Sequence, residues 1–323
     1  MKLKVLLTRK LHGFAIKELK KRYDVEVNHG KIPMPKKELI SKIRNKDGLI
    51  CFPYDVIDSE IIDAAKNLKA ISTYSVGYDQ IDIKHTTMKG IVVSYTPEVL
   101  TRATADLTIA LILDLMRRVA EGDRIIRNNK WKTIFGPYDF LGNDLYGKTL
   151  GIFGMGRIGK AVAKRAMGFE MNVLYHSRHR LSKSEEKNLG VRYVSLEKLF
   201  EESDIASIHT PYTKETHEMV NLQLLKSMKS TSVLINTARG KIIKEKDLVF
   251  ALRKKIISGA ALDVFQKEPV DRKHPLVRMK NVVLTPHIGS STEETRRRMT
   301  EITVENLILS LSGKNPRYTV NTS

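Results

Sequence analysis

Three residues in the second half of the chain have side chains that together suit the reduction of a carbonyl group. Arg239, Glu268 and His287 each closely follow a short apolar run of the kind found in buried strands. An arginine can bind a carboxylate through two hydrogen bonds and polarise a neighbouring carbonyl. A histidine can deliver a proton near neutral pH, and a carboxylate behind it fixes its tautomer and raises its pKa. Taken singly, each of the three residues could equally be an ordinary loop or turn residue.

Residues 148–180 predict the element that would hold a redox cofactor. Gly154, Gly156 and Gly159 form a G-x-G-x-x-G step between an apolar run, Thr149–Phe153, and a stretch with helical spacing. A second apolar run follows at residues 171–175. In this strand–turn–helix–strand context the three glycines allow a tight turn, the approach of a pyrophosphate and close packing of the helix on the strand. The free N–H groups at the helix start would bind the phosphates, so we predict a dinucleotide site.

The residues after the second strand indicate which dinucleotide is bound. An NAD site usually carries an acidic residue there, which accepts from the ribose 2′-hydroxyl. Here the sequence reads His-Ser-Arg-His-Arg, with Ser177, Arg178 and Arg180 able to donate to a 2′-phosphate. We therefore expect NADP(H) to be preferred, with NAD(H) as the alternative if these arginines only solvate a loop.

The elements that must position these residues alternate between strand and helix along the chain, which is typical of parallel sheets. One long helix is expected at residues 101–127, followed by an aromatic-bearing loop at 128–145. Further predicted strands cover residues 4–8, 25–27, 48–52, 70–74, 91–94, 191–194, 205–209, 233–236, 259–264 and 282–284. Helices are expected at residues 13–22, 36–44, 59–66, 196–201, 246–254 and 292–311. The pattern predicts an α/β fold with two doubly wound parallel-sheet lobes.

Composition limits the classes of protein that need to be considered. The chain has 323 residues, enough for two domains, and 41% of them are hydrophobic. No apolar run approaches the length of a membrane span, and we expect no membrane association. The single cysteine, Cys51, lies at a predicted strand end and reads as a small core residue, which fits a reducing cytoplasm. The net charge of +20 comes from short basic clusters spread along helical segments, so we expect no nucleic-acid binding but an attraction for anions.

Four ordered strings, GIFGMGRIG, INTARGK, ALDVFQKEP and TPHIGSST, give the chain a strong resemblance to the D-isomer-specific 2-hydroxyacid dehydrogenase family. The resemblance extends to STYSVGYDQID and TPEVLTRATADLTIALIL, and so covers nearly the whole chain. It implies a flavodoxin-like substrate lobe of residues 1–98 plus 288–323 and a Rossmann cofactor lobe of residues 99–287, with a cleft between them. The early helix and loop of the cofactor lobe would form a dimer arm, so a homodimer is expected.

The resemblance also implies roles for individual residues. Arg239 would bind the substrate carboxylate and carbonyl, His287 would be the general acid/base, and Glu268 would pair with His287. The backbone N–H groups of Val76 and Gly77 would hold the substrate carboxylate. The cofactor would be contacted by Thr104, Gly154, Met155, Gly156, Arg157, Ile158, Gly159, Ser177, Arg178, Arg180, His209, Thr210, Pro211, Thr237, Ala238, Arg239, Asp263, His287 and Gly289. No metal is expected.

Within the family, the ending Ser177-Arg178-His179-Arg180 resembles that of NADPH-dependent glyoxylate and hydroxypyruvate reductases. Glu268 argues against the formate dehydrogenase branch, which usually has Gln there. The alternative of a D-3-phosphoglycerate dehydrogenase-like enzyme is disfavoured because the loop at residues 51–55 is apolar and acidic and offers no cation to a phosphate. A dinucleotide-sensing corepressor-like protein shares the fold, but no partner-peptide groove is marked in the sequence. Arg102 departs from relatives, which often have an acid there, and would bias the site towards anions.

Overall fold

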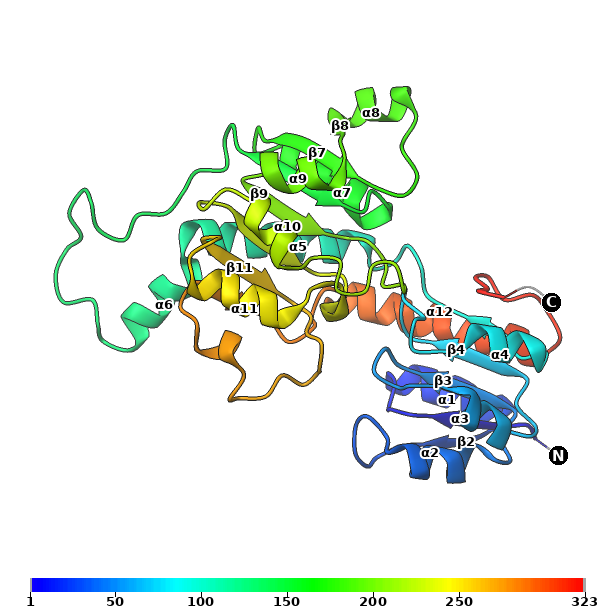
Figure 1. Cartoon of the computed structure of the whole chain (residues 1–323). Helices are drawn as coiled ribbons and strands as arrows, with labels where there is room; N and C mark the ends of the chain where they lie inside the picture. Colours follow the sequence, from blue (N-terminus) through cyan, green and yellow to red (C-terminus); the bar gives the residue numbers. More distant parts are fainter. Residues whose placement is uncertain (1, 322–323) are drawn as a thin grey trace. The chain divides into compact units, whose positions relative to one another are not determined.

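The computed structural model describes residues 2–321, which divide into two compact units. The first unit contains residues up to Leu100 together with the segment from Ser290, and the second runs from Thr101 to Gly289. These limits lie two residues from the lobe boundaries expected from the sequence. Each unit is built on its own parallel sheet, and the α/β class of two parallel-sheet lobes is confirmed (Figure 1).

The first unit has a five-stranded parallel sheet in the order β2-β1-β3-β4-β5. Its elements are β1 (Lys4–Leu7), α1 (Gly13–Arg22), β2 (Asp24–Val27), α2 (Lys36–Ile43), β3 (Gly48–Cys51), α3 (Ser59–Ala64), β4 (Ala70–Thr73), α4 (Ile83–Met88), β5 (Val92–Ser94) and α12 (Glu293–Leu311). The last helix, α12, returns from the C-terminal part of the chain and packs against β3, β4 and β5 beside α1. Cys51 is fully buried at the end of β3, so its interpretation as a core residue is confirmed.

The second unit has a seven-stranded parallel sheet in the order β12-β11-β10-β9-β6-β7-β8. Its elements are α5 (Thr101–Arg117), α6 (Val119–Arg127), β6 (Thr149–Phe153), α7 (Arg157–Met167), β7 (Asn172–His176), α8 (Lys183–Leu189), β8 (Val191–Tyr193), α9 (Leu196–Glu202), β9 (Ile205–Ile208), α10 (Leu222–Ser227), β10 (Val233–Asn236), η1 (Gly240–Ile242), α11 (Glu245–Arg253), β11 (Gly259–Leu262), η2 (Pro275–Arg278) and β12 (Val282–Leu284). The chain order reverses between β6 and β9, which is the switch point where doubly wound sheets bind ligands.

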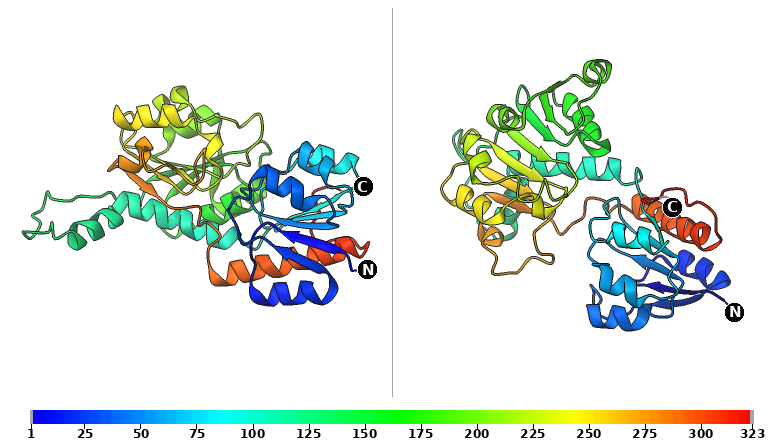
Figure 2. Two further views of the ribbon diagram at one scale, coloured as in Figure 1. Left: turned by 90° about the horizontal axis from the view of Figure 1, so that it is seen from below. Right: turned by 45° about the vertical axis from the view of Figure 1, so that its right-hand side comes forward.

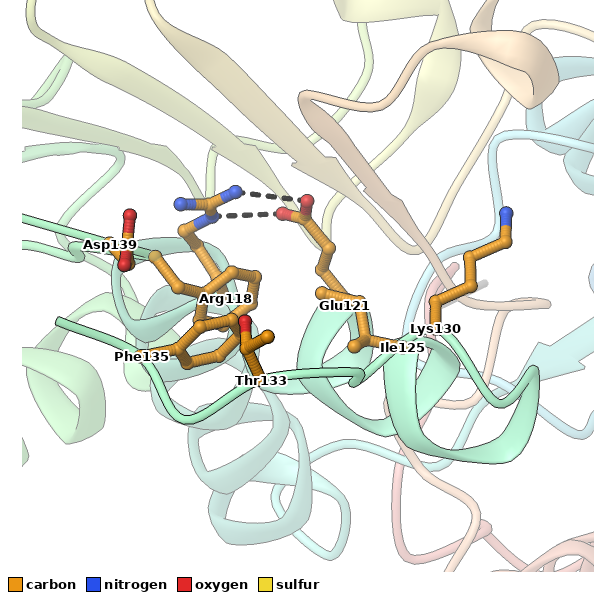
Figure 3. Close-up of a pocket in the computed structure, with 8 residues that line it drawn as sticks. Arg118, Glu121, Ile125, Lys130, Thr133, Phe135 and Asp139 are labelled. Atoms are coloured by element: carbon orange, nitrogen blue, oxygen red, sulfur yellow. Dashed lines mark hydrogen bonds and ion pairs between the residues drawn. The ribbon is translucent and has the colours of Figure 1, made fainter.

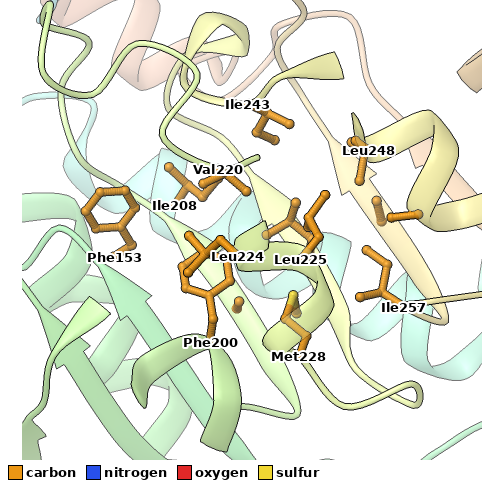
Figure 4. Close-up of a cluster of buried hydrophobic side chains, with 14 of the residues drawn as sticks. Phe153, Phe200, Ile208, Val220, Leu224, Leu225, Met228, Ile243, Leu248 and Ile257 are labelled. Carbon is orange, nitrogen blue, oxygen red and sulfur yellow. The ribbon is translucent and has the colours of Figure 1, made fainter. Parts of the chain in front are cut away.

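Alternate residues of the central strands feed two separate cores on the two faces of this sheet. On one face, Phe153 and Ile208 pack with Phe200 of α9 and Leu225 of α10 (Figure 4). On the other face, Ile152 and its neighbours pack against the apolar sides of α5 and α7. The strands read as almost continuous apolar runs because both faces are covered.

The long helix expected at residues 101–127 is in fact two helices, α5 and α6. The break falls at Arg118, which has a left-handed backbone with φ of 57°. After the break, the amide of Ala120 donates to Asp114, and the amide of Asn143 donates to the carbonyl of Met116 at the end of α5. The returning loop therefore ends α5, a contact between distant residues that helical periodicity alone does not reveal. The short helices α4, α8 and α10 are also absent from the sequence-based expectation.

No helix within residues 2–321 is both long enough and apolar enough to cross a membrane. Over the same residues, no three His, Cys, Asp or Glu side chains gather as a possible metal site.

Candidate active site

The glycine turn joins β6 to α7 with the geometry that the sequence predicts. Gly154 has φ of 105°, and a Cβ there would collide with the backbone of His209 and Thr210. A Cβ at Gly159 would collide with the carbonyl oxygen of Gly154, so this glycine lets α7 pack directly on the turn. By contrast, a Cβ at Gly156 would meet nothing within 4 Å, and this residue caps α7 without any side-chain hydrogen bond. The start of α7 therefore has no side-chain cap and has open space beside Gly156, as a phosphate site requires.

The two arginines of the loop after β7, which the sequence assigned to a 2′-phosphate, have different partners. The guanidinium of Arg180 makes two hydrogen bonds to Glu186 of α8, at 2.8 and 2.9 Å, and lies over the ring of Tyr193. These bonds and that of Tyr175 lower the pKa of Glu186 to about 2, against the opposing effect of burial. Arg178 is exposed and donates to the neighbouring ring of His179, beside the half-buried Ser177. Arg180 thus stabilises the loop, while Arg178 and Ser177 stay accessible.

Arg239 lies in the turn after β10, directly before a glycine that allows a close approach. A Cβ at Gly240 would collide with the backbone of Phe265 and Gln266, so no other residue fits without a shift of the chain. The turn is also held by Asn236, whose side chain donates to the carbonyl of Arg239 and accepts from the amide of Ala238. Consequently the half-buried Arg239 is fixed next to the loop that follows β11 and carries Glu268.

His287 and Glu268 are joined by a hydrogen bond, with 2.7 Å between Nδ1 and Oε2. Burial raises the pKa of Glu268, but the hydrogen bond and charge of His287, the amide of Phe265 and the charge of Arg239 outweigh it, and the pKa lies below its ordinary value. Glu268 is therefore ionised at neutral pH and accepts from Nδ1–H of His287. Its Nε2 then remains available to a substrate.

Asp263 holds the backbone that presents His287. Its buried carboxylate accepts from the amides of Ile288 and Gly289, both at 2.8 Å, and from the hydroxyl of Thr285. Burial raises the pKa of Asp263 despite these donors. The backbone of His287 is left-handed, with φ of 54°, and its amide donates to the carbonyl of Asp263. The family resemblance implies a role for Asp263 beside the nicotinamide, and the structure adds this anchoring of the 287–289 turn.

The remaining candidate cofactor residues lie at the ends of neighbouring strands of the same sheet. The hydroxyl of Thr104 on α5 donates to the carbonyl of Gly289, and that of Thr108 bonds to Thr237. His209 directly follows β9, and its Nε2 is 2.8 Å from the hydroxyl of Ser207. Burial lowers the pKa of His209 to about 3, so this ring is neutral. The other candidates lie in or beside the glycine step and in the turns after β9 and β10: Met155, Arg157, Ile158, Thr210, Pro211 and Ala238.

Val76 and Gly77 belong to the first unit, where they follow β4. The loop is held by a chain of side-chain hydrogen bonds in which Gln80 donates to Thr73, Thr73 contacts Ser75, and the Ser75 hydroxyl donates to the carbonyl of Gly77. Val76 and Gly77 are themselves half-buried. Sequence reasoning missed this chain, although Ser, Thr and Gln around a glycine turn are the residues able to build one.

Comparison with known proteins places this geometry in a family. The sequence profile of the D-isomer specific 2-hydroxyacid dehydrogenase NAD binding domain matches residues 109–289. The chain is 45% identical to a glyoxylate reductase of Korarchaeum cryptofilum over 99% of its own length and 96% of that protein. The chain belongs to the D-isomer specific 2-hydroxyacid dehydrogenases.

Two solved structures of similar chains support this membership in the family. A structure of the TT0316 protein from Thermus thermophilus superposes with a TM-score of 0.92 at 46% identity, covering 99% of this chain and 100% of that one. A NADPH-dependent glyoxylate/hydroxypyruvate reductase from Sinorhizobium meliloti, solved with NADP and malonate, gives 0.87 at 30% identity, covering 99% and 97%. As a D-isomer specific 2-hydroxyacid dehydrogenase, the protein is an NAD(P)-dependent oxidoreductase.

The residues of this dehydrogenase fit a nicotinamide dinucleotide. The space above Gly156 and the uncapped start of α7 suit a pyrophosphate. Within the described residues, the loop from Ser177 to Arg180 holds no acid that would bind a ribose 2′-hydroxyl. Thr237 and Asp263 directly follow the neighbouring strands β10 and β11, on the carboxyl edge of the sheet. The cofactor would therefore lie across this edge of the seven-stranded sheet.

Proposed function

We propose that the protein reduces glyoxylate or hydroxypyruvate with NADPH to the corresponding 2-hydroxy acid, glycolate or D-glycerate. The observation that carries the proposal is the His287–Glu268 pair, held beside the Arg239–Gly240 turn. An arginine and a carboxylate-supported histidine are the two groups that the reduction of a 2-oxo acid needs from a protein. The similar Korarchaeum protein is a glyoxylate reductase and the similar Sinorhizobium protein is a glyoxylate/hydroxypyruvate reductase, and both support this choice of substrates.

In the proposed reaction the protein binds, polarises and protonates the substrate. Arg239 binds the carboxylate and the carbonyl oxygen, and the backbone N–H groups of Val76 and Gly77 hold the carboxylate. Bound NADPH supplies the hydride that reduces the carbonyl carbon. His287 gives its Nε2 proton to the carbonyl oxygen, and Glu268 stabilises the charged form of the ring and keeps its orientation. The hydride and the proton together convert the carbonyl to a hydroxyl.

The preference for NADPH rests on the loop after β7. Arg178 is exposed and Ser177 is half-buried beside it, and this accessibility of two possible donors supports the proposed contact with a 2′-phosphate. Arg180 contributes less directly than the sequence suggested, because Glu186 already takes its guanidinium in two hydrogen bonds. We therefore assign the phosphate contact to Ser177 and Arg178, with Arg180 shaping the loop.

The test is a set of initial rates with NADPH and NADH, each with glyoxylate, hydroxypyruvate and pyruvate. Turnover of the first two with a preference for NADPH is expected, and Arg178→Ala should reduce that preference about 10-fold or more, since it removes a charge-assisted hydrogen bond. Arg192→Ala is the control, because Arg192 is an exposed arginine paired with Glu202. A preference for NADH in the unaltered enzyme would contradict the phosphate site, and no turnover with any pair would contradict the proposed reaction.

We also propose that the enzyme is a homodimer joined through the segment of residues 119–146. Figures 1 and 2 show α6 and the following loop projecting from the rest of the second unit, and α6 buries none of its own residues. Apolar side chains on this segment are strongly exposed, with Ile134 at 90% and Tyr138 at 88%. Next to the segment, Arg118 pairs with Glu121 and lies over Phe140, beside Phe135 (Figure 3). Exposed apolar side chains on a projecting segment are typical of a surface that packs against another protein chain, which supports the proposal.

Sedimentation equilibrium tests this assembly. The unaltered chain should sediment as a dimer, and Ile134→Asp should shift it towards the monomer by placing a charge in the apolar contact. Val56→Asp, at an exposed apolar residue of the first unit, is the matched control. A monomeric unaltered chain would contradict the proposal. A chain with a single cysteine forms no internal disulfide, which supports the reducing cytoplasm that we propose as its compartment.

A further inference from the structure

The segment that follows α12 turns back and pairs with β5, the edge strand of the five-stranded sheet. The backbone of Gly313, with φ of 73°, helps to reverse the chain just after the helix. The chain then runs antiparallel beside β5. The carbonyl of Tyr318 accepts from the amide of Tyr95, and the amide of Val320 donates to the carbonyl of Val93. A segment remote in the sequence therefore covers the open edge of this sheet.

Two asparagine side chains complete the pairing. Asn321 accepts from the amide of Val93 at 2.7 Å and donates to the carbonyl of Ile91 at 2.9 Å. Asn306 of α12 is fully buried, where it donates to the carbonyl of Tyr95 and accepts from a backbone amide of the returning segment. An edge strand without partners leaves its outer backbone groups to water and frays easily. Here these bonds fix the outer side of β5.

Three tyrosine rings form a row from this segment to the loop after β4. The rings of Tyr318 and Tyr95 meet at an angle of 74°, with their centres 6.3 Å apart. The rings of Tyr95 and Tyr78 meet at 80°, with their centres 5.6 Å apart. Both pairs have the edge-to-face geometry that aromatic rings prefer. Tyr78 directly follows Val76 and Gly77, so the row ends beside the backbone proposed to hold the substrate carboxylate.

The outer end of the row is held by charged residues. The phenol of Tyr318 donates to the carboxylate of Glu98 at 3.3 Å, and the guanidinium of Arg317 lies 5.3 Å from the centre of the Tyr318 ring. At the other end, Tyr78 is 39% exposed. Because an exposed ring has few neighbours, the contact with Tyr95 is an important part of what orients Tyr78.

A backbone hydrogen bond joins the end of β5 to the same loop. The amide of Thr96, which follows Tyr95, donates to the carbonyl of Ser75 at 2.9 Å. Ser75 directly precedes Val76, and its hydroxyl donates to the carbonyl of Gly77. The end of β5 therefore contacts the loop on both sides of these two residues, through the backbone before them and through a ring after them. A shift of this strand end would displace the two amides that lie between the contacts.

We propose that Tyr318 and Tyr95 are positioning residues, through which the segment after α12 orients the backbone amides of Val76 and Gly77. The inference rests on the proposed function, in which these amides bind the substrate carboxylate. Hydrogen bonds weaken when their distance and angle change, so displaced amides hold the carboxylate less tightly. Neither tyrosine transfers a proton in the proposed reaction, and their loss should therefore weaken substrate binding more than it slows the chemical step.

The test is the kinetics of Tyr318→Ala with NADPH and either glyoxylate or hydroxypyruvate. KM for the 2-oxo acid should rise about 3-fold to 10-fold, the change that corresponds to the loss of one aromatic pair, while kcat changes little. Tyr318→Phe keeps the ring and loses only the bond to Glu98, so it should restore most of the affinity. An unchanged KM in Tyr318→Ala, or a loss confined to kcat, would overturn the inference.

Asn321→Ala is the matched control, because it removes hydrogen bonds between the same segment and β5 but none of the ring contacts. It should lower the melting temperature and leave KM unchanged. A KM raised as much by Asn321→Ala as by Tyr318→Ala would overturn the inference, since the effect would then follow stability alone. Arg298→Ala, at an exposed arginine of α12 that pairs with Glu301, should alter neither quantity.

If no 2-oxo acid is reduced, the proposed function fails, and NMR spectroscopy decides the inference separately. The backbone amide signals of Val76 and Gly77 should shift in Tyr318→Ala and keep their positions in Asn321→Ala. Unshifted signals in Tyr318→Ala would show that the row of rings does not orient this loop, and would overturn the inference.

Discussion

The carboxyl edges of the two sheets carry different kinds of site. In the seven-stranded sheet, Arg239 and His287 lie within three residues of the strands that precede them, and glycines let neighbouring turns touch. In the five-stranded sheet, the loop of Val76 and Gly77 is contacted by a row of tyrosines that begins at Tyr318, beyond the last helix. The first site consists of short motifs, whereas the second depends on where the segment after α12 packs.

The two sites also differ in the contacts that hold their side chains in position. A buried carboxylate and a close backbone approach position the residues of the second unit: the side chain of Asp263 holds the amides of Ile288 and Gly289, and Gly240 lets the backbone of Phe265 come close. Side chains position the residues of the first unit, through edge-to-face rings and the hydrogen bonds of Ser75. Substitutions at the edge of the seven-stranded sheet should therefore disable the chemistry, and those at the edge of the five-stranded sheet should change substrate binding.

The largest effect is expected at His287. His287→Asn keeps a side chain that tolerates the left-handed backbone but removes the proton donor, so kcat should fall by about 10²-fold to 10⁴-fold. Steady-state rates with glyoxylate measure the loss, and Arg298→Ala serves as the unaffected reference. A variant that keeps a tenth of the activity would show that another group protonates the substrate.

Substitutions at two glycines of the turn should distinguish its role in folding from its role in cofactor binding. Gly159→Ala should lower the free energy of unfolding by about 1–3 kcal/mol, because its Cβ collides with the carbonyl of Gly154. Gly156→Ala should cost less stability, about 0.5–1 kcal/mol for alanine at an N-cap, because its Cβ meets open space, yet weaken NADPH binding about 10-fold by obstructing the phosphate. Thermal melts and fluorescence titration measure the two quantities. Equal losses of stability in both variants would refute the distinction.

Glu268→Gln should reduce kcat by about 10-fold to 100-fold, the worth of a hydrogen bond to a charged group. Its effect on stability should depend on pH. The folded-state pKa of Glu268 is lower than the ordinary 4.5, so the stabilisation is complete above that value and is lost as pH falls through the lowered pKa. The difference in melting temperature between Glu268→Gln and the unaltered chain should therefore shrink below about pH 4.5. A difference independent of pH would contradict this linkage.

The smallest effect is expected in the first unit. Ser75→Ala removes the hydroxyl that holds the carbonyl of Gly77, so KM for glyoxylate should rise several-fold while kcat changes little. Ser312→Ala is the control, at an exposed serine near the C-terminal end of α12 whose hydroxyl bonds to its own helix. A loss confined to kcat would place Ser75 in the chemistry and weaken the contrast between the two edges.

Much of the fold could be predicted from the sequence because its signals are local. Strand, glycine turn and helix at residues 149–167 follow one another without a gap. The close contact at Gly159 lies within this unit, and that at Gly154 is with the turn directly after the neighbouring strand β9. The prediction of one long helix at residues 101–127 is wrong, since the break at Arg118 depends on a loop that returns at Asn143 to bind the end of α5. Helical periodicity continues through such a break, and only the distant contact reveals it.

The parallel-sheet lobes, the dinucleotide turn and the candidate catalytic residues Arg239, Glu268 and His287 could all be predicted from the amino-acid sequence. These features are encoded in residues adjacent to strand ends, where parallel topology brings them together. The sequence does not reveal that the guanidinium of Arg180 binds Glu186 while Arg178 stays accessible, or that Arg9 and Arg296 both act on Tyr54; these contacts are seen in the folded protein. The physical reason is that charges act through space, so their partners depend on packing between elements that are remote in the chain.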